Sequence, residues 1–181
     1  MTVNDAFEIL LSEAPTYGRW DFRHNLDGFM TFSTMFQSKN PYSYVQIFRD
    51  GSLEFYTSHL HFERKNEPEK LDLSGKKFEI VSIESIRTAF DVFQYYQIEP
   101  PYAVFISLFD LENAVVFVEN LYGDSTGVIG KSELLLPSVV FNDTNQDISK
   151  TMKSTFDILW QAGNYKKSPF YNDNDERIVP E

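Results

Sequence analysis

Apolar residues recur along the chain with two different periods, and these periods predict its helices and strands. Helical spacing of three and four occurs in three places. It predicts an N-terminal helix with its lead-in over residues 1–19, a second helix over 83–97 and a third over 147–162. Ser82 is the candidate N-cap of the second helix. Gly163 stands at the C′ position of the third, where a left-handed residue often ends a helix.

Alternation of apolar and polar residues with period two predicts strands in the first third of the chain. A first strand is expected over residues 29–34, directly after the turn pair Asp27-Gly28. Residues 44–57 read as a β-hairpin around Asp50-Gly51. This pair suits a type I′ turn, because it tolerates positive φ at both central positions.

The second half of the chain contains apolar runs that do not alternate. Residues 102–109 and 115–118 are apolar at nearly every position, which predicts strands covered on both faces in the middle of a sheet. The run 134–141 is interrupted by Pro137, which favours an edge strand or a bend, since proline cannot donate a ladder hydrogen bond.

The remaining segments complete the predicted fold. Residues 61–77 carry many charges of both signs and few apolar positions, so an exposed connection is expected there. Residues 164–181 form a polar C-terminal tail. Helices and strands in mixed order predict an α+β fold, with one domain over residues 1–181 and a central, mostly antiparallel sheet flanked by two or three helices.

Charge and composition narrow the function. The 181-residue chain has 27 acidic and 16 basic side chains and a net charge of −11, which disfavours direct contact with the nucleic-acid backbone. The absence of cysteine excludes disulfides, thiolate catalysis and zinc–cysteine sites. The N-terminus does not resemble a secretory signal, and no apolar run is long enough for a membrane helix. These features predict a cytoplasmic protein without membrane contact.

Motifs for nucleotide binding and for nucleophilic hydrolysis are missing from the sequence. There is no P-loop, no dinucleotide-binding glycine pattern and no Gly-x-Ser-x-Gly elbow. The glycine-rich segment 123–130 comes closest to a phosphate loop, but no helix pattern follows it, so a turn between strands is the better interpretation. No catalytic residue and no cofactor are predicted.

Two histidines offer the sequence's candidate metal site. His59 and His61 would share one face of an extended strand, and Glu63 would follow on the same face. Two histidines and one carboxylate can hold a transition metal. A surface pair of histidines without metal is the competing interpretation, and it is favoured because a His-x-His spacing arises easily by chance.

Aromatic residues gather at the end of the third predicted helix and after it. The binding or interface candidates are Trp160, Asn164, Tyr165 and Tyr171. Trp and Tyr are frequent in interface hot spots, so a dimer face is one interpretation. The alternative, which is favoured, is that these rings pack back onto the core.

Five segments, taken in order, resemble a known family. They read DGFMTFS at 27–33, YVQIFRDGSLE at 44–54, IEPPYAVFISL at 98–108, LLPSVV at 135–140 and FDILWQAGNY at 156–165. In this order they resemble the C-terminal region of bacterial proteins that begin with a Schlafen-like, Alba-type DNA-binding and ATP-binding domain. The likeness extends over most of residues 20 to 175, and none of that family's catalytic or nucleotide-binding motifs falls within it.

The resemblance implies a non-enzymatic binding, sensing or oligomerisation domain of a Schlafen-like regulator, with a protein partner or self-association. Two alternatives remain open. One is a metal-dependent enzyme of unrecognised type that uses His59, His61 and Glu63. The other is an acidic interaction protein that mimics nucleic acid or neutralises a basic partner, which the net charge of −11 would suit.

Overall fold

The structure is a computed structural model that describes residues 19–34, 41–64, 67–118 and 127–178. The predicted N-terminal helix lies outside the described residues. Contacts within the chain gather into two compact units. The first unit comprises Met1–His59 with Thr88–Glu99, and the second comprises Leu60–Arg87 with Pro100–Glu181. The α+β class with mostly antiparallel strand pairing is confirmed.

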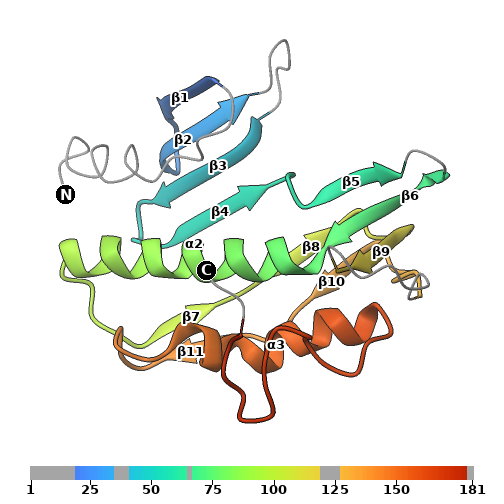
Figure 1. Ribbon diagram of the computed structural model, residues 1–181. Coiled ribbons are helices and arrows are strands. Elements are labelled where there is room, and N and C mark those ends of the chain that lie inside the picture. The colour runs from blue at the N-terminus through green and yellow to red at the C-terminus, as the bar shows by residue number, and fades with distance from the viewer. Residues whose placement is uncertain (1–18, 35–40, 65–66, 119–126, 179–181) are drawn as a thin grey trace. The chain divides into compact units, whose positions relative to one another are not determined.

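The described part of the first unit contains a four-stranded antiparallel sheet whose strands follow one another in sequence order (Figure 1). The strands are β1 (Arg19–His24), β2 (Gly28–Thr34), β3 (Pro41–Phe48) and β4 (Leu53–Thr57). The strand predicted after Asp27-Gly28 is confirmed as β2. One face of the sheet holds this unit's core, where Phe29, Val45 and Ile47 pack with Val92.

The hairpin between β3 and β4 is confirmed, but its predicted turn type is wrong. Phe48 accepts a hydrogen bond from the Gly51 amide at 3.0 Å, and the Phe48 amide donates to the Ser52 carbonyl at 2.9 Å. Gly51 has φ of 90°, whereas Asp50 is not among the residues with positive φ. The loop is therefore a three-residue turn that closes with a left-handed glycine.

The predicted exposed connection over residues 61–77 is wrong, because this segment forms two strands and the start of a helix. The three-stranded sheet of the second unit has the order β5-β6-β9 and consists of β5 (His61–Arg64), β6 (Glu67–Ser74) and β9 (Ala114–Phe117). β6 pairs antiparallel with β5 and parallel with β9. Leu73 is fully buried between charged and polar neighbours. The high count of charges in the segment concealed this strand.

The second predicted helix begins eight residues earlier than expected, as α2 (Gly75–Tyr95). Ser74 caps it, since its hydroxyl accepts a hydrogen bond from the Lys77 amide at 3.2 Å. Ser82 is not the cap; its hydroxyl donates to the Phe78 carbonyl within the helix at 2.8 Å. The buried residues of the helix are Phe78, Glu79, Ile83, Ile86, Phe90 and Val92.

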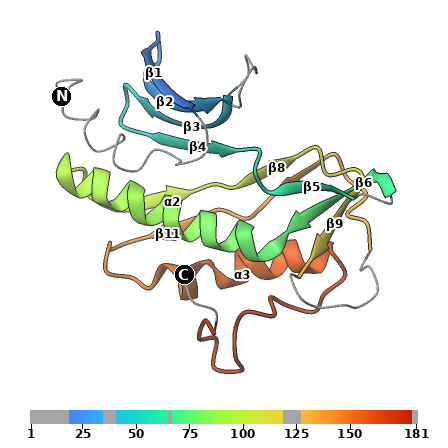
Figure 2. The same cartoon turned by 45° about the horizontal axis from the view of Figure 1, so that its top comes forward.

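The run at 102–109 does not form the middle of a sheet. It pairs with residues 133–141 in two short antiparallel ribbons (Figure 2). β7 (Tyr102–Val104) pairs with β11 (Val139–Phe141), and β8 (Ser107–Phe109) pairs with β10 (Glu133–Leu135). The break between β10 and β11 confirms the interruption predicted at Pro137. β9, the other expected central strand, is largely buried; among the described strands it pairs with β6, and its Val115 also forms an isolated bridge with Val128.

The third predicted helix is confirmed as α3 (Ile148–Ala162). Asp147 is its N-cap and accepts the Lys150 amide at 3.0 Å, and this hydrogen bond holds the pKa of Asp147 below its usual value. The prediction of a left-handed conformation at Gly163 is wrong, since its φ is −86°. Asn164 adopts this conformation instead, with φ of 68°. Glycine is needed at 163 because an added Cβ would lie 2.6 Å from the Val116 Cβ.

Candidate functional site

The residues of the predicted metal site do not form a described cluster. His59 is the last residue of the segment Met1–His59 of the first unit, and its ring packs edge-on against Tyr42 with 4.2 Å between centroids. His61 and Glu63 lie in β5 of the second unit, and their side chains are outside the described part of the structure. The described residues contain no group of three side chains that could hold a metal ion. The metal site stays a prediction without structural support.

The glycine-rich segment 123–130 is only partly described. Residues 119–126 lie outside the described ranges, so the predicted turn cannot be placed there. Beyond them, Val128 forms an antiparallel bridge with Val115, and Gly130 has a left-handed φ of 67°. The bridge places this end of the segment next to β9.

The predicted aromatic interface is wrong for two of its four residues. Trp160 is fully buried and Tyr171 is nearly so, which leaves too little surface for either to contact a partner. The Tyr165 ring packs edge-on against Trp160 with 4.9 Å between centroids. Asn164 is exposed at the left-handed position after α3. The alternative interpretation, in which these rings pack onto the core, is confirmed for Trp160 and Tyr171.

Trp160 instead belongs to a buried network around Glu79, a carboxylate on α2 that sequence reasoning did not single out. Glu79 is fully buried. Its Oε1 accepts hydrogen bonds from the Trp160 Nε1 at 2.8 Å and the Ser168 hydroxyl at 2.5 Å. Its Oε2 pairs with the Arg177 guanidinium. A buried charge is tolerated when it is paired and fully hydrogen-bonded in this way. The network therefore fastens the C-terminal segment to α2 and α3.

Within the described residues, Arg177 is held by its Nη1, which pairs with Glu79. Its Nε and Nη2 atoms are buried and have no hydrogen-bond partner in the described part of the chain. The guanidinium carbon lies 5.6 Å from the centroid of the Tyr171 ring, whose face offers partial compensation for the positive charge. Tyr171 in turn donates its hydroxyl hydrogen to the Ser149 carbonyl at 2.9 Å. Burial of this kind indicates a structural role for the network.

Tyr171 gives this network a pH dependence. Burial, assisted by the nearby Glu79 charge, raises the pKa of Tyr171 from 10.0 to about 12. Between these two values the unfolded chain has lost the phenol proton while the folded protein keeps it, so folding stability falls as the pH rises. We expect the free energy of unfolding to decrease from pH 10 to 12 less steeply in Tyr171→Phe than in the parent protein. Urea titrations at several pH values measure both slopes, and equal slopes would refute the assignment.

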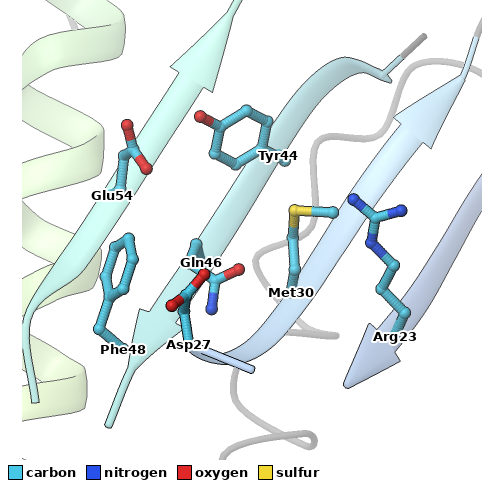
Figure 3. Close-up of a pocket in the computed structure, with 7 residues that line it drawn as sticks. All are labelled: Arg23, Asp27, Met30, Tyr44, Gln46, Phe48 and Glu54. Carbon is cyan, nitrogen blue, oxygen red and sulfur yellow. The ribbon is translucent and has the colours of Figure 1, made fainter. Parts of the chain in front are cut away.

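The second face of the β1–β4 sheet carries a pocket of about 300 Å³, which is the candidate binding site (Figure 3). Four of its lining residues form one row across all four strands. The register pairs Arg23 with Met30, Met30 with Gln46, and Gln46 with Glu54. Since neighbouring strands lie about 4.8 Å apart, the Cα atoms at the two ends of the row are about 14 Å apart. The row thus places a cation on β1 and an anion on β4.

Aromatic side chains line the same face beside this charged row. Tyr44 stacks on Tyr56 with 5.0 Å between ring centroids, and the Arg23 guanidinium lies 5.5 Å from the Phe32 ring. Burial, with the charge and hydrogen bonding of Glu54, raises the pKa of the Tyr44 phenol. Tyr44 therefore keeps its proton at neutral pH and can donate a hydrogen bond.

The floor of the pocket is fixed by hydrogen bonds. The Asn25 side chain donates a hydrogen bond to the Gln46 Oε1 at 2.7 Å, and the side-chain Nε2 of Gln46 donates to the Ile47 carbonyl at 2.8 Å. Gln46 and Met30 are buried, whereas Asp27 and Glu54 at the border are exposed. A rigid amphipathic floor with charged borders suits recognition of a small polar ligand.

Sequence reasoning named none of the pocket residues as candidates. The hairpin prediction carried a partial signal, since alternate positions on its outer face hold Tyr44, Gln46, Glu54 and Tyr56. The contribution of Arg23 depends on the pairing of β1 with β2, and β1 was not predicted as a strand.

Comparison with models of protein families, with characterised proteins and with solved structures finds no match to this chain. In the part of the chain that the structure describes, no helix has both the length and the apolar character needed to cross a membrane.

Proposed function

We propose that this chain is a binding or sensing domain that does not catalyse a reaction, with the sheet-face pocket as its ligand site. The observation that carries the proposal is the row from Arg23 to Glu54, which places opposite charges at the two ends of one pocket. Tyr44, whose pKa is raised by burial and by Glu54, keeps its proton and adds a hydrogen-bonding group to the same face.

The proposed role of this domain within a larger protein rests on the five segments that resemble the Schlafen-like family. Their order supports a role as the C-terminal region of a Schlafen-like regulator, which acts with a protein partner in the cytoplasm. The net charge of −11 supports a division of labour in which this region does not itself contact nucleic acid.

The charges of the pocket select a zwitterionic ligand. Arg23 suits a carboxylate, and Glu54 suits an ammonium group. An extended peptide rises about 3.3 Å per residue, so three or four residues span the row between these side chains. Tyr44 and Phe48 line the pocket from β3 on either side of Gln46, where an apolar or aromatic ligand side chain would be accommodated. A tripeptide with free termini and a central aromatic residue therefore fits the site.

The tripeptide Ala-Phe-Ala is the probe, together with its N-acetylated form and its C-amidated form. Isothermal titration calorimetry is expected to show binding of the free tripeptide and about tenfold weaker binding of each blocked form, because each lacks one charge-assisted hydrogen bond. Arg23→Gln should weaken binding of the free peptide but not of the C-amide. Glu54→Gln should weaken binding of the free peptide but not of the N-acetyl form.

Glu84→Gln is the matched control, since it removes an exposed carboxylate from α2 and leaves the pocket unchanged. The proposal would be refuted by absence of binding, by equal affinity for the free and blocked peptides, or by equal effects of Glu84→Gln and Glu54→Gln.

A further inference from the structure

The ribbons of the second unit expose a row of large apolar side chains. Phe105 is 75% exposed, Leu135 65%, Phe109 55% and Val140 50%. Singly exposed apolar residues are common on protein surfaces, but a group of four on two successive ribbons is not. We call this group, with Ala103 beside it, the ribbon face.

The strand register places these residues on one side of the ribbons. Burial alternates without interruption from Tyr102 to Phe109, so the side chains of 103, 105, 107 and 109 share the exposed side. Across the ribbons, Val140 lies opposite Ala103 and Leu135 lies opposite Ser107. The exposed apolar side chains thus form a continuous strip along the ribbons.

The other side of the same ribbons is packed into the core of the second unit. The buried residues there are Tyr102, Leu108, Leu136 and Phe141. Strands that are apolar on both sides are typical of sheets covered on both sides. In the part of the chain that the structure describes, one side has its cover and the ribbon face does not, and this pattern favours a cover supplied by another molecule.

The charges around the ribbon face indicate the charge of the molecule that would cover it. Asp110 and Glu112 follow β8 directly and are exposed, and Glu133 is exposed opposite Phe109. Lys131 is the one exposed basic residue in the neighbouring segment 127–133. A second copy of this chain would bring the same acidic border and a further net charge of −11, and such like-charge contacts are unfavourable. A protein partner with an apolar centre and a basic border is complementary.

We propose that the ribbon face is a docking surface for a second protein, whose contact region has apolar residues at its centre and lysine or arginine around them. Phe105 and Phe109 insert into the partner's apolar centre, as aromatic residues do at interface hot spots. The acidic border steers the partner and sets its orientation. This surface lies in the second unit and is distinct from the sheet-face pocket of the first.

The test uses two synthetic, fluorescein-labelled octapeptides of equal composition, four valines and four lysines. In one the residues alternate, so that an extended strand has an apolar side and a basic side; in the other the four valines precede the four lysines. Fluorescence anisotropy is expected to show tighter binding of the alternating peptide by at least about tenfold. Its affinity should fall as salt rises from 50 to 300 mM, since the acidic border contributes.

The variant Phe105→Ser/Leu135→Ser should lose at least about tenfold in affinity for the alternating peptide. Leu26→Ser is the matched control, because Leu26 is an exposed apolar residue of the first unit, and it should leave binding unchanged. Both variants alter exposed side chains, and circular dichroism verifies that they fold.

Three results would overturn the proposal. Equal binding of the two peptides would show that only net charge is recognised. Equal affinity of the parent protein and the Phe105→Ser/Leu135→Ser variant would place binding elsewhere. Sedimentation velocity that showed a dimer of the parent protein and a monomer of this variant would identify a second copy as the occupant instead.

Discussion

Glu79→Gln is expected to lower the free energy of unfolding by about 3–5 kcal/mol. The substitution leaves an acceptor for Trp160 and Ser168 but removes the charge that compensates Arg177, whose side chain is almost completely buried. An uncompensated charge in the interior costs about that much. Urea unfolding followed by circular dichroism measures the loss.

Two further variants separate the ion pair from other effects of the change. Glu84→Gln alters an exposed carboxylate on the same helix and should change stability by less than about 0.5 kcal/mol. The double variant Glu79→Met/Arg177→Met removes both charges and should be clearly more stable than Glu79→Gln. A loss below about 1 kcal/mol for Glu79→Gln would contradict the buried network.

Trp160→Ala is expected to destabilise the protein by about 3–5 kcal/mol, the usual cost of truncating a large buried aromatic residue. The Trp160 ring is fully buried, packs edge-on against Phe170 at 5.6 Å between centroids, and lies against Gly75. Its loss leaves a cavity and removes one of the hydrogen bonds to Glu79. Urea unfolding gives the magnitude.

Trp160→Phe isolates the hydrogen bond, because it keeps most of the ring volume while removing the indole N–H. We expect this variant to lose about 1–3 kcal/mol, less than Trp160→Ala. Tyr95→Ala is the control, since Tyr95 is an exposed aromatic residue near the end of α2. Equal stability of Trp160→Ala and Tyr95→Ala would show that the aromatic cluster is not part of the core.

Sequence patterns predicted the elements that alternate or repeat cleanly. The β3–β4 hairpin and α3 were predicted from short-range spacing and turn chemistry, and both are confirmed. They succeeded because the two-residue period of a strand and the helical period of about 3.6 residues each reflect a single buried face.

The failures arose where the decisive information was not local. β6 looked like a loop because its charges concealed the buried Leu73, whose burial depends on the pairing of β6 with β9. The run 102–109 looked like a central strand because Phe105 and Phe109 are apolar, although the structure leaves both exposed. The apolar content of a segment therefore does not show whether the folded protein covers both of its sides.

The candidate site was hidden for the same reason. Its row joins residues that are up to 31 positions apart, from Arg23 to Glu54, and only the register of four strands places them together. The buried Glu79 was equally hidden, since its partners Trp160, Ser168 and Arg177 lie more than 80 positions away. In both cases no single residue stands out in the sequence, and the site is recognised only when the fold brings its residues together.

Nuclear magnetic resonance titration of the isotope-labelled protein with Ala-Phe-Ala tests the central claim most directly, because it locates the ligand without a variant. The proposed function predicts chemical-shift changes concentrated in the strands that line the pocket, with the largest at Arg23, Tyr44, Gln46 and Glu54. Shift changes confined to other parts of the chain, or none at peptide concentrations up to the millimolar range, would contradict it.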